Sequence, residues 1–128
     1  MRKTTPVREY MSRLPEEVDR AAPLRSALQT MTERHVRHIP VMNGVELFGV
    51  LSRQDVQDAW LRFGETADEK SVGDVCTRDV LTVDPLAKIP DVAREMVDRG
   101  ITSALVLDAG VLVGIFTSTD ALRVLAEA

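Results

Sequence analysis

The chain contains an internal repeat with a spacing of 65 residues. Residues 7–57 align with residues 72–122 without a gap, and most of the pairs that differ keep their chemical character. The identical pairs include Val7 with Val72, Asp19 with Asp84, Met31 with Met96, Gly49 with Gly114, and Asp55 with Asp120. A repeat of this length is small for independent folding, so we expect the two copies to pack on each other around one shared core.

The composition is that of an ordinary globular protein and excludes several classes of function. Of the 128 residues, 45% are hydrophobic and 28% are charged, which gives no reason to expect disorder. The net charge of -4 argues against a general nucleic-acid binder, because such proteins neutralise phosphates with a surplus of Lys and Arg. No apolar run approaches the roughly 20 residues needed to span a membrane, and the N-terminus lacks a signal-peptide pattern. We therefore expect a cytoplasmic protein without membrane or nucleic-acid partners.

Hydrophobic periodicity and turn residues predict the same mixed α/β (α+β) unit in each half, in the order strand, helix, strand, strand, helix. Apolar residues at helical spacing indicate each first helix, and two apolar runs around a short glycine-containing turn indicate each hairpin. In the second half the expected elements cover residues 80–83, 89–97, 102–107, 111–116 and a helix from about Thr117 onward. In the first half the helix, the two hairpin strands and the last helix cover residues 24–31, 39–42, 45–51 and 55–61.

A polar segment separates the two halves. Residues 64–71 lack hydrophobic periodicity, so we expect repeat 1 at 1–63, a linker at 64–71 and repeat 2 at 72–128. The first strand of repeat 1 is the weaker one, because Pro15-Glu16-Glu17-Val18 stands where repeat 2 has Val80-Leu81-Thr82-Val83.

One motif occurs in both repeats where a strand is expected to become a helix. Residues 49–55 and 114–120 both read as glycine, two apolar residues, Ser or Thr, two further residues and aspartate. The spacing of hydroxyl and carboxylate is typical of a capping box, in which each side chain bonds a backbone amide of the helix start. A second interpretation adds a ligand without removing the cap. The helix N-terminus suits a phosphate and the carboxylate suits the two hydroxyls of a ribose, so the motif is also compatible with a nucleotide site.

The doubling, the order of elements and this motif together resemble the CBS domain, named from cystathionine β-synthase, in the tandem pair called a Bateman module. The segments Arg37-His38-Ile39-Pro40-Val41 and Asp79-Val80-Leu81-Thr82-Val83-Asp84-Pro85 also resemble strands of that family. The resemblance implies two repeats packed with pseudo-twofold symmetry and two clefts for adenosine-containing ligands such as AMP, ATP, NAD or S-adenosylmethionine.

The resemblance also implies roles for individual residues. Asp55 and Asp120 would hold ribose hydroxyls, Ser52 and Thr117 would lie near phosphate, and residues around Ile39 and Ala104 would contact the base. The full set of ligand-binding candidates is Arg37, His38, Ile39, Pro40, Ser52, Arg53, Asp55, Thr82, Thr102, Ser103, Ala104, Thr117 and Asp120.

Local charge distinguishes the two expected clefts. Repeat 1 has Arg37, His38 and Arg53 where repeat 2 has the neutral residues Thr102, Ser103 and Ser118. A phosphate beside an aspartate needs a nearby cation, so we expect AMP or ATP to prefer the Asp55 cleft.

No set of residues suggests a metal site or catalysis. His35 and His38 are the only histidines, and no acidic or Cys residue beside them completes a recognisable ligand set, so we interpret them as part of a basic patch with the neighbouring arginines. Cys76 is the only cysteine, which excludes an internal disulfide, and we interpret it as a buried apolar residue. We therefore expect neither a metal nor a required cofactor, and no enzymatic activity.

The leading interpretation is a regulatory module that binds an adenine nucleotide and acts on an unidentified partner protein. The alternative is a ligand-independent dimerisation scaffold in which both aspartates serve only as helix caps. In either case we expect a homodimer, with the helices near Trp60 and near Leu122–Leu125 as the contact surface.

Overall fold

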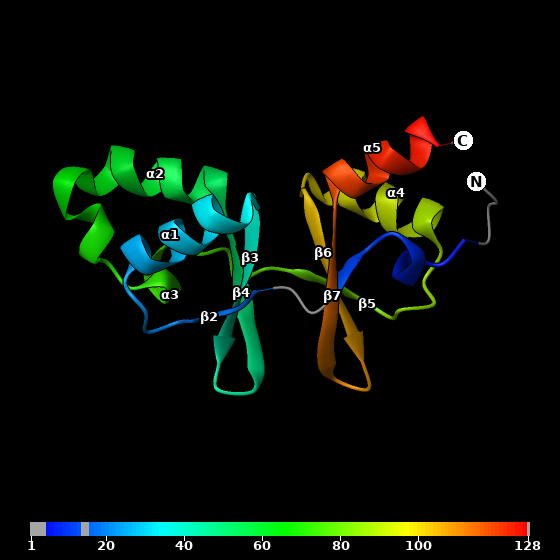
Figure 1. Cartoon of the computed structure of the whole chain (residues 1–128), viewed down its shortest axis with the longest axis horizontal. Coiled ribbons are helices and arrows are strands. Elements are labelled where there is room, and N and C mark those ends of the chain that lie inside the picture. Colours follow the sequence, from blue (N-terminus) through cyan, green and yellow to red (C-terminus); the bar gives the residue numbers. More distant parts are fainter. Residues whose placement is uncertain (1–4, 14–15, 128) are drawn as a thin grey trace. The chain divides into compact units, whose positions relative to one another are not determined.

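The computed structural model describes residues 5–13 and 16–127, which form two compact units. We call residues 16–79 the Asp55 unit, and residues 5–13 together with 80–127 the Asp120 unit. Each unit contains a β hairpin with helices packed against it (Figure 1). The expected mixed α/β (α+β) fold with two matching repeats is confirmed.

The Asp55 unit has a three-stranded sheet in the order β2-β3-β4, with β2 parallel and β4 antiparallel to the central strand. Its elements are β2 (Val18–Asp19), α1 (Leu24–Arg34), β3 (His38–Asn43), β4 (Glu46–Ser52), α2 (Arg53–Phe63), η2 (Gly64–Glu69) and α3 (Val72–Val75). The predicted apolar stripe of α1 faces the core, where Leu24, Ala27 and Met31 are fully buried. The sheet and the two long helices therefore enclose one aliphatic core.

The Asp120 unit has a four-stranded sheet in the order β1-β7-β6-β5. Its elements are η1 (Val7–Glu9), β1 (Ser12–Arg13), β5 (Leu81–Val83), α4 (Ile89–Arg99), β6 (Ser103–Asp108), β7 (Val111–Thr117) and α5 (Ser118–Ala126). Ile89, Val92 and Met96 of α4 pack into its core, and Gly100 ends that helix in the left-handed conformation.

The two hairpins are equivalent in register as well as in sequence. His38 pairs with Ser52 in the first and Ser103 with Thr117 in the second, so the strand ends that carry the two motifs correspond. Both hairpins also have an irregularity at the same place, after Val41 in one and after Val106 in the other. The two hairpins therefore correspond residue by residue.

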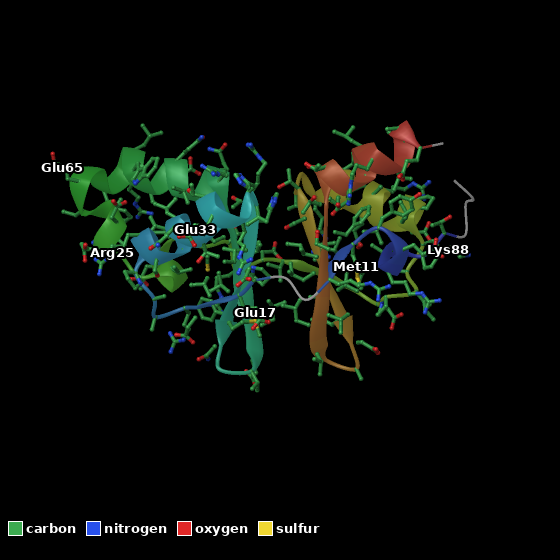
Figure 2. All side chains as sticks on the ribbon, in the orientation of Figure 1. Met11, Glu17, Arg25, Glu33, Glu65 and Lys88 are labelled. Atoms are coloured by element: carbon green, nitrogen blue, oxygen red, sulfur yellow. The ribbon has the colours of Figure 1, made fainter. Side chains whose placement is uncertain are left out.

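In each unit, the core includes a short segment that comes from the other sequence repeat. Val7 is fully buried in the core of the Asp120 unit, and its amide donates to the carbonyl of Ala87 at 2.8 Å. Met11, labelled in Figure 2, precedes β1, which pairs antiparallel with β7. Val72, the sequence equivalent of Val7, is fully buried in the core of the Asp55 unit. The compact units therefore differ from the sequence repeats, because the first segment of each repeat packs in the unit that holds the hairpin of the other.

The segment expected to be a linker is part of the Asp55 unit. Ala67, in η2, is fully buried in its core, and Arg25 of α1 forms an ion pair of 2.5 Å with Glu69. We expected the first strand of repeat 1 to be weak. Its Pro15 lies outside the described residues, and its Val18 begins the two-residue strand β2. Among the described residues, no helix has the length and apolar character required to cross a bilayer.

Candidate functional site

The first motif lies where β4 runs directly into α2. Ser52 is the N-cap residue: its Oγ accepts from the amide of Asp55 at 3.1 Å, and its own amide donates to Asp55 Oδ2 at 2.9 Å. A Cβ at Gly49 would overlap the carbonyl oxygen of Thr77, so glycine allows the segment around Thr77 to pack directly on β4. The capping box predicted from the spacing is confirmed in this copy.

Thr77 is a further polar neighbour of Asp55 that the motif did not reveal. Its hydroxyl lies 3.0 Å from Asp55 Oδ1 and 3.2 Å from Oδ2, and donates its one proton to this carboxylate. In the alignment of the two repeats, Thr77 corresponds to Ser12. A hydroxyl side chain present in both copies was therefore the sequence signal that could have indicated this neighbour of Asp55.

The second motif has the same cap but a different environment. Thr117 is the N-cap residue of α5, and its amide donates to Asp120 Oδ2 at 2.8 Å while the amide of Asp120 lies 3.4 Å from Thr117 Oγ1. The other oxygen of Asp120 forms an ion pair with Arg123, one helical turn further along. Arg123 also reaches the carbonyl of Tyr10, at 3.3 Å, in the N-terminal segment. The capping box is confirmed here too, and the spacing of three residues between Asp120 and Arg123 was the missed signal for the ion pair.

A hollow of about 280 Å³ opens beside Asp55 in its own unit. It is lined by side chains of α2 and of the segment 74–76, namely Asp55, Asp58, Ala59, Arg62, Phe63, Asp74, Val75 and Cys76. Burial raises the pKa of the Cys76 thiol, and the negative charge of Asp55 raises it further. The hollow is acidic overall, since three carboxylates face a single guanidinium.

The structure brings together the predicted basic residues of repeat 1 at the start of α2. The amide of Arg53 donates to the carbonyl of Arg37 at 3.0 Å, and His38 lies opposite Ser52 in the hairpin. Ile39, with 1% of its surface exposed, and Pro40 belong to the interior of the Asp55 unit, where the side chain of Ile39 packs in the core.

The corresponding residues of repeat 2 occupy equivalent positions. The amide of Ser118 donates to the carbonyl of Thr102 at 3.0 Å, and Ser103 lies opposite Thr117. Ala104 is fully buried in the core, whereas Thr82 is exposed on β5, where it pairs with Leu105 of β6. Contact of Ile39 and Ala104 with a base, and of Thr82 with any ligand, stays a prediction.

The two histidines lie close to the end of α1. His35 is the C-cap residue of α1 and has a left-handed backbone with φ of 55°, while His38 begins β3. Within residues 5–13 and 16–127, no three His, Cys, Asp or Glu side chains are arranged to hold a metal ion.

The chain is similar over most of its length to proteins of known sequence. It is 35% identical over 122 residues to protein MJ1225 of Methanocaldococcus jannaschii, a match that covers 94% of this chain and 42% of that protein. A second relative from the same organism, MJ1232, is 30% identical over 105 residues, which cover 80% of this chain and 33% of the relative. The chain thus spans less than half the length of these curated relatives.

Solved structures share the fold across nearly the whole chain. The structure of CBSX2 in complex with AMP is 26% identical with a TM-score of 0.77, and the match covers 95% of this chain and 96% of that one. The CBS domain pair of MJ0100, solved with 5'-methylthioadenosine and S-adenosyl-L-methionine, has a TM-score of 0.87 at 23% identity and covers 97% and 98% of the two chains. The family model of the CBS domain matches twice, at residues 7–62 and 72–127. With two matched copies, each ending in a capped strand-to-helix motif, the chain belongs to the CBS domain family.

Proposed function

We propose that this chain is a regulatory, non-catalytic module that binds an adenosine-containing nucleotide, AMP or ATP in preference to NAD or S-adenosylmethionine. In this proposal Asp55 and Asp120 accept hydrogen bonds from ribose hydroxyls, and Ser52 and Thr117 lie near phosphate. The observation that carries the proposal is the presence of two equivalent sites, each with a carboxylate in the first turn of a helix that follows a buried strand. The AMP complex of the similar protein CBSX2 supports the choice of ligand class.

The chemistry of the Asp55 site fits such a ligand. A carboxylate accepts about four hydrogen bonds, so the contacts from Ser52 and Thr77 leave acceptor capacity for a ribose. Arg37 and Arg53, adjacent through their backbones, and the positive end of α2 offer charge for a phosphate.

The second candidate function is a ligand-independent scaffold, and the role of both aspartates in capping their helices favours it. Both aspartates already have a structural role, since each bonds the amide of its own N-cap residue. In addition, α2 exposes Leu61 to 88% and α5 exposes Leu125 to 68%, which suits contact with another protein surface. We propose that these helices pair two copies of the chain, and this assembly is compatible with either function.

Titration with nucleotides separates the two candidates. In thermal shift and calorimetry with AMP, ADP, ATP, NAD and S-adenosylmethionine, a specific ligand at 100 times its Kd should stabilise the fold by about 2.7 kcal/mol. Asp55→Asn and Asp120→Asn should each weaken binding at their own site by about 1 to 3 kcal/mol, because each removes a charged hydrogen-bond acceptor.

Asp91→Asn is the matched control. Asp91 also lies in the first turn of a helix, α4, but the N-cap residue of that helix, Lys88, makes no side-chain cap. Its replacement should leave nucleotide binding unchanged. Absence of binding by every nucleotide, together with loss of stability in Asp55→Asn and Asp120→Asn, would favour the scaffold. Fluorescence of a tagged chain in cells would test the expected cytoplasmic location.

A further inference from the structure

We propose that Arg123 blocks the Asp120 carboxylate, so that an adenosine compound occupies the Asp55 site first and the Asp120 site only when Arg123 is displaced. This inference rests on the proposed function, in which both aspartates bind ribose. The residue three positions after each aspartate then determines which of the two sites is available.

The Asp120 carboxylate has little capacity left for a ligand. Oδ2 accepts from the amide of Thr117 at 2.8 Å and from its hydroxyl at 3.2 Å, and Oδ1 is paired with the Arg123 guanidinium. The side chain of Asp120 is only 6% exposed. A ribose hydroxyl that approaches Oδ1 therefore has to replace a charged donor by a neutral one, which costs affinity.

Arg123 is held at a second point, which favours the paired conformation. The same guanidinium nitrogen that meets Asp120 lies 3.3 Å from the carbonyl oxygen of Tyr10. Tyr10 belongs to the N-terminal segment that completes this unit, so two elements position the side chain. The side chain of Arg123 is nevertheless 59% exposed, so it has room to swing away when a ligand competes.

The Asp55 site has the opposite charge at the equivalent position. Asp58 follows Asp55 by three residues, where repeat 2 has Arg123. Asp58 accepts a hydrogen bond of 2.9 Å from Gln54, and Asp55 receives the neutral hydroxyl of Thr77 in place of a guanidinium. Asp55 is half-buried and lines the 280 Å³ hollow, so its carboxylate is reachable from solvent.

The cationic side chain that lines the hollow, Arg62, does not pair with Asp55 as Arg123 pairs with Asp120. Its guanidinium lies over the ring of Phe63, 5.2 Å from the ring centre. The hollow thus keeps an accessible carboxylate, whereas the carboxylate of Asp120 is covered. The two repeats share one motif but differ in whether that motif is ready to receive a ligand.

Calorimetry with uncharged adenosine, and in parallel with AMP, tests this inference. Asp55→Asn isolates the Asp120 site, and adding Arg123→Gln to that variant should raise adenosine affinity about 2- to 5-fold, the range expected for removing a partly exposed ion pair. Asp120→Asn isolates the Asp55 site, and adding Asp58→Arg should lower affinity there by a similar factor. The wild type should bind one adenosine per chain with higher affinity than a second.

Arg94→Gln is the control, because Arg94 makes an exposed ion pair of the same spacing with Asp91 on α4, and neither residue belongs to either motif. This variant should leave the adenosine affinity of both sites unchanged.

The inference is overturned if Arg123→Gln leaves the adenosine affinity of the Asp120 site unchanged, or if Asp120→Asn alone abolishes the stronger binding event. If the wild type and every variant bind neither adenosine nor AMP, the proposed function itself fails. Unfolding curves that overlay for the wild type and Arg123→Gln would show that the variant acts on the site rather than on folding.

Discussion

Replacing His35 by glycine should stabilise the Asp55 unit. His35 ends α1 in the left-handed conformation with φ of 55°, and Gly100 ends α4 at the equivalent position with φ of 65°. In both places the next residue bonds back to the helix, Val36 to Met31 and Ile101 to Met96, each at 3.0 Å. The two helix ends are therefore the same motif, with the favourable residue in only one of them.

The magnitude follows from two opposing terms. A residue with a Cβ in this conformation costs about 1 to 2 kcal/mol, and glycine loses roughly 0.5 to 1 kcal/mol more conformational entropy on folding. His35→Gly should therefore add about 0.5 to 1 kcal/mol to the free energy of unfolding, which raises Tm by about 2 to 4 °C. Gly100→Ala is the reciprocal change, and it should lower stability by a similar amount, because a Cβ there meets only open space and the cost is conformational.

Urea unfolding of the three proteins, followed by circular dichroism, measures both effects. A less stable His35→Gly variant would refute this reasoning, because it would show that the imidazole contributes more to stability than the left-handed backbone costs.

Repeating the unfolding with added Zn²⁺ tests the role of the histidines. Stabilisation of the wild type by Zn²⁺ that disappears in His35→Gly would contradict their interpretation as a basic patch.

Four further outcomes are expected. Gly49→Ala should destabilise the Asp55 unit by about 1 to 3 kcal/mol in the same urea assay, because the new methyl overlaps a backbone oxygen, and an unchanged midpoint would contradict this packing. The pKa of Cys76 lies above its ordinary 9.0, so alkylation by iodoacetamide should have a midpoint above that pH, and Asp55→Asn should lower the midpoint by removing a negative charge. Because the folded thiol holds its proton more tightly than the unfolded one, stability should fall as pH rises past 9.0, and Cys76→Ala should remove that part of the decline. Leu61→Glu and Leu125→Glu should convert the proposed homodimer to monomers in light scattering, since each places a charge on an exposed apolar helix face, and a mass near 14.2 kDa for the wild type would refute the assembly.

Local sequence signals predicted the long helices and the hairpins of this fold, but not η1, β1, η2 or α3. The helices α1 and α4, both hairpins and both capping boxes follow from spacing and turn residues that lie within a few positions of one another. Contacts between residues that lie far apart in the sequence could not be predicted. Nothing in the periodicity of residues 5–13 indicates that Val7 is buried in the unit formed by residues 80–127.

The same distinction holds at the candidate site. Ser52 with Asp55 and Thr117 with Asp120 were predicted because three residues separate each pair. Thr77 was missed because it reaches Asp55 from 22 positions away. Its role depends on the segment after α3 packing against β4, a tertiary contact that only the structure reveals.

The assignment of the N-terminal segment to the Asp120 unit has a consequence for the order of folding. The Asp55 unit is continuous in sequence and is complete once residue 79 has been synthesised, whereas the other unit needs both residues 5–13 and residues 80–127. Bringing those two segments together closes a loop that contains the entire first unit, and the entropy cost of closure grows with the length of free chain between the ends. Prior folding of residues 16–79 shortens that free chain. We therefore expect the continuous unit to form first during synthesis and the discontinuous unit to complete its fold afterwards.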